Sequence, residues 1–315
     1  MNNFAEHWEE AGIKAREIAL QLVWNQWSSL GSMARSTSFK NKNRVIDPES
    51  LVLTSVALQK EERRLTEVLA WWAHDGTGLL SVQRMKKMAS KTRSNGKDLF
   101  SEYAQLAALC GHRSWNNYAE HENQPELLHN HQKDTRLELR GPENLLLRLR
   151  ATFGVGAKAD IMSFLVSTPQ FSATVPEISK YLDFSNKAVR DALKDMNVAG
   201  LVRESSGRPA SYSTNQLAWV DLMRSKSDNK TDHPEWALWS AIFPFLTSAM
   251  EICTAAVSSS LNSFLVNSYA RDLIETYQYA FEFHQIELPD LAEYPGREFS
   301  AAFLQSINSL ASWAK

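Results

Sequence analysis

The chain has 315 residues, of which 43% are hydrophobic and 22% are charged, and its formal net charge is -2. This length fits two or three domains, and this composition supplies a hydrophobic core, which excludes a chain that is disordered throughout. The small net charge excludes a protein that is basic over its whole surface, so any charge that binds nucleic acid must be local.

The cysteine content and the first residues bear on the compartment. Only two cysteines are present, Cys110 and Cys253, and they lie far apart in the sequence. We therefore expect no disulfide framework, and we expect the protein to reside in a reducing compartment. The first residues lack a basic stretch followed by an apolar run. We therefore expect no secretory leader and a cytoplasmic protein.

Residues 1–120 are expected to form a helical N-terminal domain. An amphipathic helix is predicted over the first thirty residues, because apolar side chains recur there at alternating spacings of four and three. Asp47 before Pro48 is typical of a helix start, and Ser81 is expected to cap a further, basic helix. The apolar stripe of the first helix consists of Phe4, Trp8, Ala11, Ala15, Ile18 and Leu22.

Two polar stretches are expected to divide the chain. Residues 121–141 contain Pro125 and three histidines, and residues 224–232 contain Ser, Lys, Asp, Asn and Thr. Such composition is typical of linkers. We therefore expect a mainly α fold with a helical N-terminal domain, a middle domain over 142–223 and a helical C-terminal domain over 233–315.

Three helices are expected within the middle domain. The first is predicted over 157–166, and the second follows a cap at Thr174. The third begins after Ser185 and ends before Gly200, a residue type that suits the left-handed conformation of a helix terminator. Because only a short turn separates the second helix from the third, the sequence predicts a helix-turn-helix, whose second helix enters the DNA major groove in the known examples.

A hairpin is expected directly after the third helix. Residues 201–204 and 211–214 are predicted to pair as two strands around a turn at 205–210. This hairpin would act as a wing beside the helix-turn-helix. Arg208, near its tip, is expected to enter the minor groove or to bind a phosphate.

Cationic side chains are predicted to follow the outward face of the third helix. Lys187, Arg190 and Lys194 recur at spacings of three and four, opposite an apolar face. Such side chains carry the donors that read base edges or bind phosphates. From the helix and the hairpin, the residues expected to contact DNA are Ser185, Asn186, Lys187, Arg190, Lys194 and Arg208.

The run 175–214 resembles the bacterial winged-helix transcription regulators of the MarR and ArsR type. The resemblance is carried by Lys187-Ala188-Val189-Arg190-Asp191-Ala192-Leu193 and by Gly207-Arg208-Pro209, and it covers residues 154–215 of the 315. It implies a sequence-specific, duplex-DNA-binding transcriptional regulator, a repressor acting as a homodimer on an inverted repeat. It implies no enzymatic activity, and we expect no cofactor.

The charge of this region leaves an alternative open. Residues 154–215 hold seven Lys or Arg and six Asp or Glu, and affinity for DNA depends largely on neutralising phosphates. The alternative is a protein-interaction module, such as an antitoxin or an adaptor subunit. It would use the winged helix to bind a protein encoded by a neighbouring gene.

A second basic stretch lies at 79–97, which contains no acidic residue. It either supplies phosphate contacts beside the wing or forms a solvated helix face. A similar stretch around 35–44 is expected to be solvated. From the first stretch, the residues added to the expected DNA contacts are Arg84, Lys86, Lys87 and Lys91.

Three other features are expected to be structural. The apolar segment 236–270 is interrupted by Pro244 and rich in serine, so we expect a buried helix and no membrane span. The aromatic residues after 233 are expected to form a core or a subunit interface, or alternatively an effector pocket. No metal site is expected, because the spacing of the candidate ligands matches no zinc module: Cys110, His112, His121, His129 and His131.

Overall fold

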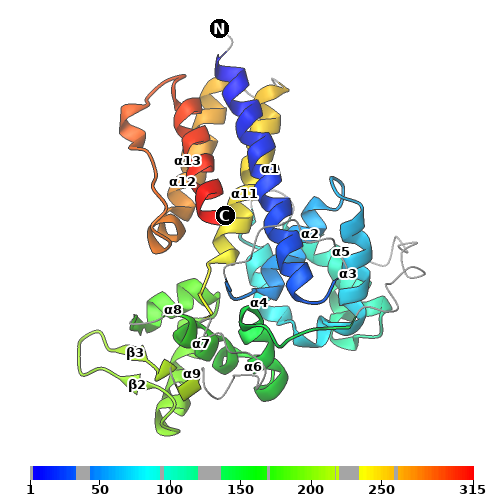
Figure 1. Cartoon of the computed structure of the whole chain (residues 1–315), viewed down its shortest axis with the longest axis vertical. Helices are drawn as coiled ribbons and strands as arrows, with labels where there is room; N and C mark the ends of the chain where they lie inside the picture. Colours follow the sequence, from blue (N-terminus) through cyan, green and yellow to red (C-terminus); the bar gives the residue numbers. More distant parts are fainter. Residues whose placement is uncertain are drawn as a thin grey trace. The chain divides into compact units, whose positions relative to one another are not determined.

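The computed structural model of the chain (Figure 1) describes residues 3–32, 43–92, 96–119, 136–168, 171–216, 218–219, 234–258 and 262–315. Of these described residues, 71% lie in helices and 3% in strands, which confirms the expected mainly α class. The expected linkers fall largely outside the described ranges, and the division into three domains stays a prediction.

The elements follow one another in the order that Figure 1 shows. The α-helices are α1 (Asn3–Ser29), α2 (Pro48–Leu58), α3 (Arg64–Asp75), α4 (Val82–Ala89), α5 (Gly96–Leu109), α6 (Leu145–Phe153), α7 (Ala157–Ser167), α8 (Val175–Leu182), α9 (Asn186–Val198), α11 (Trp239–Val257), α12 (Ser263–Phe283) and α13 (Phe299–Ala314). The 3-10 helices are η1 (Thr77–Leu79), η2 (Arg113–Tyr118), η4 (Pro142–Asn144) and η5 (Leu291–Glu293). The strands are β1 (Ala173–Thr174), β2 (Arg203–Glu204) and β3 (Ser211–Ser213).

Side-chain caps begin several of these helices. The Asp47 carboxylate accepts from the Ser50 backbone N–H at 3.2 Å, directly before Pro48, the first residue of α2. The Ser81 hydroxyl accepts from the Arg84 N–H at 3.3 Å and starts α4. Both caps were expected from the sequence, because they need only a polar side chain three residues before a free N–H group.

The described chain forms two compact units. Among the described residues, the first consists of 3–25 together with those of 241–315, and its core is aromatic. The Trp8 ring of α1 lies 4.9 Å from the Phe303 ring of α13, and Phe245 of α11 packs edge-on against Phe281 of α12 at 4.9 Å. The aromatic residues of the C-terminal helices thus form a core, which is one of the roles that the sequence predicts for them.

α11 is the apolar helix of this part of the chain. Over the described residues, it is the one helix long and apolar enough to cross a membrane, and 50% of its most apolar window is buried inside the protein. α1 and α11 approach closely at Gly12, where an added Cβ would lie 2.8 Å from the Cβ of Cys253. A small residue is therefore required at this point of α1.

The second unit consists of Gln26–Ala34 and Asn41–Ser240. Its N-terminal part is built around three indole rings, with Trp27 packed edge-on against Trp71 and Trp72 at 6.3 and 5.4 Å. The Trp27 indole N–H donates to the Ser55 hydroxyl at 2.9 Å, so this polar atom is paired inside the core.

The same unit contains the stretch from α7 to β3, which we call the α7–β3 region (residues 157–213). Three helices and three short strands alternate in the order α7, β1, α8, α9, β2, β3. The strands form an antiparallel sheet in the order β1-β3-β2, with Ala173 opposite Tyr212 and Arg203 opposite Ser213. The two hairpin strands were expected, whereas β1 was not, because two residues give no alternating pattern in the sequence.

Candidate nucleic-acid interface

α9 exposes the side chains that the sequence analysis selected. The Ser185 hydroxyl accepts from the Ala188 N–H at 3.2 Å and starts the helix, and Gly200, with a φ of 71°, follows its end. The buried face of α9 consists of Val189, Ala192, Leu193 and Met196. The exposed residues include Ser185, Asn186, Lys187, Arg190 and Lys194.

The hairpin presents Arg208 beyond the paired strands. β2 and β3 pair through Arg203 opposite Ser213 and Glu204 opposite Tyr212. The Ser205 hydroxyl accepts from the Ser211 N–H at 2.9 Å and closes the base of the turn. Arg208 is exposed within that turn, and Arg203 adds an exposed cation on β2 that the sequence analysis did not select.

α9 and the hairpin meet electrostatically at Tyr212. Burial raises the pKa of the Tyr212 hydroxyl, as do the negative charge of Glu204 and the hydrogen bond to it, while the charge of Arg190 lowers it. The charge of Arg190 on α9 therefore acts on the Tyr212 hydroxyl of β3.

Most acidic residues of 154–215 are already engaged. The Glu177 carboxylate accepts from the Thr174 backbone N–H at 2.7 Å as part of a capping box at the start of α8. Asp195 pairs with Lys158 at 2.7 Å, and the hydrogen bond and charge of Lys158 lower the pKa of Asp195. Two more acids, Asp160 and Asp183, lie in ion pairs with Arg150 and Lys91.

This pairing leaves few acidic side chains of residues 154–215 to offset the cations on the surface. Of its six acids, only Asp191 and Glu204 are exposed without a cap or a salt bridge to occupy them, and Glu204 bonds to Tyr212. Lys187 and Arg208 make no hydrogen bond or ion pair with other residues that the structure describes. The exposed surface is therefore more basic than the count of seven against six suggests.

α4 holds the turn between α8 and α9. The Arg84 Nε donates to the Leu182 carbonyl at 2.8 Å, and the Lys87 Nζ donates to the Phe184 carbonyl at 3.0 Å. Lys91 pairs with the buried carboxylate of Asp183, a residue with a φ of 60° in the turn itself. Three cations from the basic stretch therefore stabilise the C-terminal end of α8, where helix carbonyls lack partners.

Arg84 is a correction to the expected DNA contacts. Its side chain is only 1% exposed, and it lies between the carboxylates of Asp47 and Glu49, with hydrogen bonds of 2.7 and 2.5 Å. A guanidinium buried in this way cannot reach a phosphate. The sequence could not reveal this, because both carboxylates are more than thirty residues away in the chain.

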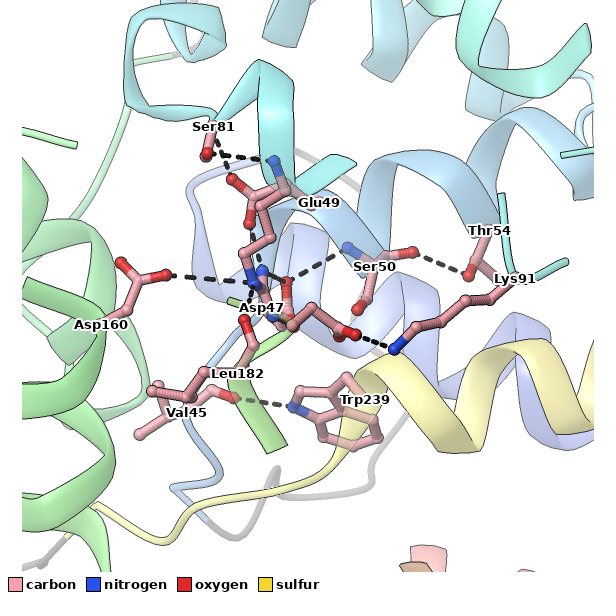
Figure 2. A network of polar contacts seen from close by, with 12 residues as sticks. Val45, Asp47, Glu49, Ser50, Thr54, Ser81, Lys91, Asp160, Leu182 and Trp239 are labelled. Carbon is pink, nitrogen blue, oxygen red and sulfur yellow. Dashed lines mark hydrogen bonds and ion pairs between the residues drawn. The ribbon is translucent and has the colours of Figure 1, made fainter. Parts of the chain in front are cut away.

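Arg84 belongs to a buried ionic network, whose acids Figure 2 shows converging from α2 and α7. Arg150 of α6 donates to Glu49 at 2.6 Å and to both oxygens of Asp160, at 2.8 and 2.6 Å. Burial disfavours the charged form of Asp47, but the charge and hydrogen bonds of Arg84 outweigh it and hold the Asp47 pKa below its ordinary value. The network ties α2, α4, α6 and α7 together.

The remaining cations of the expected set have mixed surroundings. Lys86, Lys87 and Lys91 are exposed, but Lys86 lies over the Tyr118 ring at 5.1 Å, and the other two bond to the turn. Arg44, expected to be solvated, is buried instead, and burial lowers its pKa. Arg35, Lys40 and Lys42 lie outside the described residues, as do His121, His129 and His131; among those described, no metal-binding cluster is found.

Comparisons with protein families, with curated proteins and with solved structures find no match to this chain. A functional conclusion therefore rests on the residues themselves.

Proposed function

We propose that residues 154–215 form a winged helix-turn-helix that binds duplex DNA. In this proposal α8 and α9 are the two helices of the helix-turn-helix, and the hairpin β2–β3 is the wing. The order of helices and strands supports it, as does the antiparallel sheet that joins the hairpin to the start of α8. α9 has 13 residues, about 20 Å of helix, which is long enough to lie in a major groove.

One observation carries the proposal: exposed cations line α9 and its hairpin, while most acids of the same region are engaged elsewhere. Asn186, Lys187 and Arg190 stand in the first turns of α9, the part of a recognition helix that faces base edges. Asparagine suits adenine, and arginine suits guanine. Lys194 and Arg208 are assigned to phosphates, with Arg208 alternatively in the minor groove.

The biological role proposed is that of a cytoplasmic transcriptional regulator, a repressor without catalytic activity. Helix-turn-helix dimers bind two half-sites about one helical turn apart, so a homodimer is expected to select an inverted repeat. Lys87 of α4 and Lys91 just after it support this role indirectly, because they hold the turn that precedes the recognition helix.

The proposal is tested by selecting bound fragments from the source genome and measuring affinity for the recovered duplex at fixed salt. The double variant Lys187→Ala/Arg190→Ala is expected to bind at least tenfold more weakly, since a base contact contributes about 1–3 kcal/mol. Lys60→Ala/Arg63→Ala removes the same charge from another exposed part of the same unit and serves as the control. Equal affinity of both variants and the wild type would contradict the assignment of α9.

A second candidate is a protein-interaction module, such as an antitoxin or an adaptor subunit. The exposed acids Asp191, next to Arg190 in the sequence, and Glu204 on β2 favour it because they weaken the positive potential. This candidate predicts co-purification with a protein encoded by a neighbouring gene, together with no salt-dependent affinity for duplex DNA.

A further inference from the structure

Large apolar side chains are exposed at one end of the α7–α9 pair. Phe153, the last residue of α6, is 62% exposed, and Val198, the last residue of α9, is 84% exposed. Val155 and Leu201 are exposed beside them in sequence. We call these four residues the end patch. Neither Phe153 nor Val198 is buried in the core of the unit, and exposed apolar side chains that lie together mark an interaction surface.

An ion pair links the two segments that carry the end patch. Lys158, in the first turn of α7, pairs with Asp195, near the end of α9, at 2.7 Å. Val155 lies three residues before Lys158, and Val198 lies one helical turn after Asp195. The Phe153 ring also packs edge-on against the Trp219 ring at 6.5 Å, which extends the apolar surface.

The charges within the end patch make it self-complementary. Lys158 and Asp195 are 59% and 60% exposed, so each has room for a second partner. A twofold axis through the patch would bring Lys158 of one copy to Asp195 of the other and bury the four apolar side chains between them. An isologous dimer requires a self-complementary surface, on which a residue of one copy contacts a complementary residue of the other copy and the reverse.

We propose that the end patch is the contact through which two copies of this chain form a homodimer. This inference rests on the proposed function, because the contact would bring the two recognition helices together near their C-terminal ends. From Lys187 to Val198 α9 rises about 16 Å, so two such helices that meet end to end at this contact would set their reading turns about 33 Å apart, close to one DNA turn. The reading residues of each copy stay free.

Mass in solution, measured by sedimentation equilibrium at micromolar protein, tests the contact. The wild type is expected to be a dimer, and Val198→Asp is expected to weaken dimerisation at least tenfold. Phe264→Asp is the matched control, because Phe264 is 79% exposed on α12, in the other unit. A monomeric wild type, or an equal effect of Val198→Asp and Phe264→Asp, would overturn the proposal.

Charge reversal gives an independent test. Lys158→Asp alone and Asp195→Lys alone are each expected to be monomeric, because each brings like charges together across the axis. An equal mixture of the two variants is expected to recover the dimer, since each supplies the charge that the other lacks. A mixture that stays monomeric while both single variants remain folded would contradict a twofold contact through this pair.

Binding to a duplex with a single half-site separates this inference from the proposed function. Val198→Asp is expected to keep half-site affinity while losing preference for the inverted repeat. If no variant binds any duplex but the dimer still depends on Val198, the DNA-binding function fails and the interface stands. If Val198→Asp keeps the full preference for the inverted repeat, the interface fails.

Discussion

Arg84 and Arg150 are, among the described residues, the basic side chains whose burial is most complete. Each lies between carboxylates that come from other elements: Glu49 is shared by both, Asp47 pairs with Arg84, and Asp160 pairs with Arg150. A guanidinium in such a position links helices through several hydrogen bonds at once. Removal of one partner leaves charges without compensation in a medium that solvates them poorly.

Replacement of Arg150 by leucine is therefore expected to lower the free energy of unfolding by about 3–5 kcal/mol. The loss arises because Glu49 and Asp160 would each keep a buried charge without this partner. Urea unfolding followed by circular dichroism measures it. Arg203→Leu, at an exposed position on β2, is expected to change the same quantity by less than about 0.5 kcal/mol. Similar losses in the two variants would contradict a structural role for the network.

The lowered pKa of Asp47 predicts how stability depends on pH. A carboxyl whose pKa is lower in the folded state stabilises that state above its unfolded pKa, and this contribution is lost as the pH falls through the folded value. The free energy of unfolding of the wild type should therefore fall below about pH 4. Asp47→Asn keeps a capping side chain but lacks the charge. Its stability deficit should shrink between pH 6 and pH 3, and a constant deficit would count against the pairing with Arg84.

Residues with local roles were predictable, and residues with distant partners were not. Asp47, Ser81 and Ser185 were expected as helix caps because each acts on an N–H group three residues away, and the structure confirms all three. Arg84 was expected on the surface because its neighbours are basic and polar. Its partners are brought to it by the packing of α2 and α8, which a linear pattern does not contain.

At the scale of elements, α4 is the support of the turn before α9. Arg84 and Lys87 of α4, and Lys91 just after its end, follow one another at spacings of three and four and bond to the backbone and the carboxylate of that turn. The basic stretch that the sequence analysis assigned partly to DNA thus acts largely inside the protein. The exposed residues of α9 itself were predictable from the sequence because exposure follows the helical period.

Lys91→Met is expected to loosen the turn between α8 and α9. Asp183 would lose its ion-pair partner while its side chain stays only 2% exposed. Amide hydrogen exchange of residues 183–188 should become several-fold faster, because local opening becomes easier. Lys86→Met removes a neighbouring cation that does not contact the turn and should leave these rates unchanged. Equal rates in all three proteins would show that the ion pair between Lys91 and Asp183 does not support the turn.

The close approach of α1 and α11 at Gly12 gives a second prediction for the elements. In Gly12→Val the new side chain would collide with Cys253, which is expected to lower the free energy of unfolding by about 1–3 kcal/mol. Gly78→Val is the control, since no atom lies within 4 Å of an added Cβ there. A thermal melt of both variants measures the difference, and equal melting temperatures would contradict this packing.

For the whole molecule, the net charge of -2 conceals a local separation of charge. Composition alone gave no indication of nucleic-acid binding, and the sequence count for 154–215 was almost neutral. Pairing inside the folded unit engages Asp160, Asp183 and Asp195, which leaves the cations of α9 and the hairpin on the surface. The class of the fold followed from helical periodicity, whereas this separation depends on contacts between distant segments.

The salt dependence of duplex binding is the most direct test of DNA recognition by α9 and the hairpin. Affinity for the selected duplex, measured by fluorescence anisotropy over a series of salt concentrations, should fall linearly on logarithmic axes. For each phosphate contact removed, as in Lys194→Ala or Arg208→Ala, the slope should decrease by about 0.9. A wild-type affinity that does not change with salt, or slopes that are identical in these variants, would contradict it.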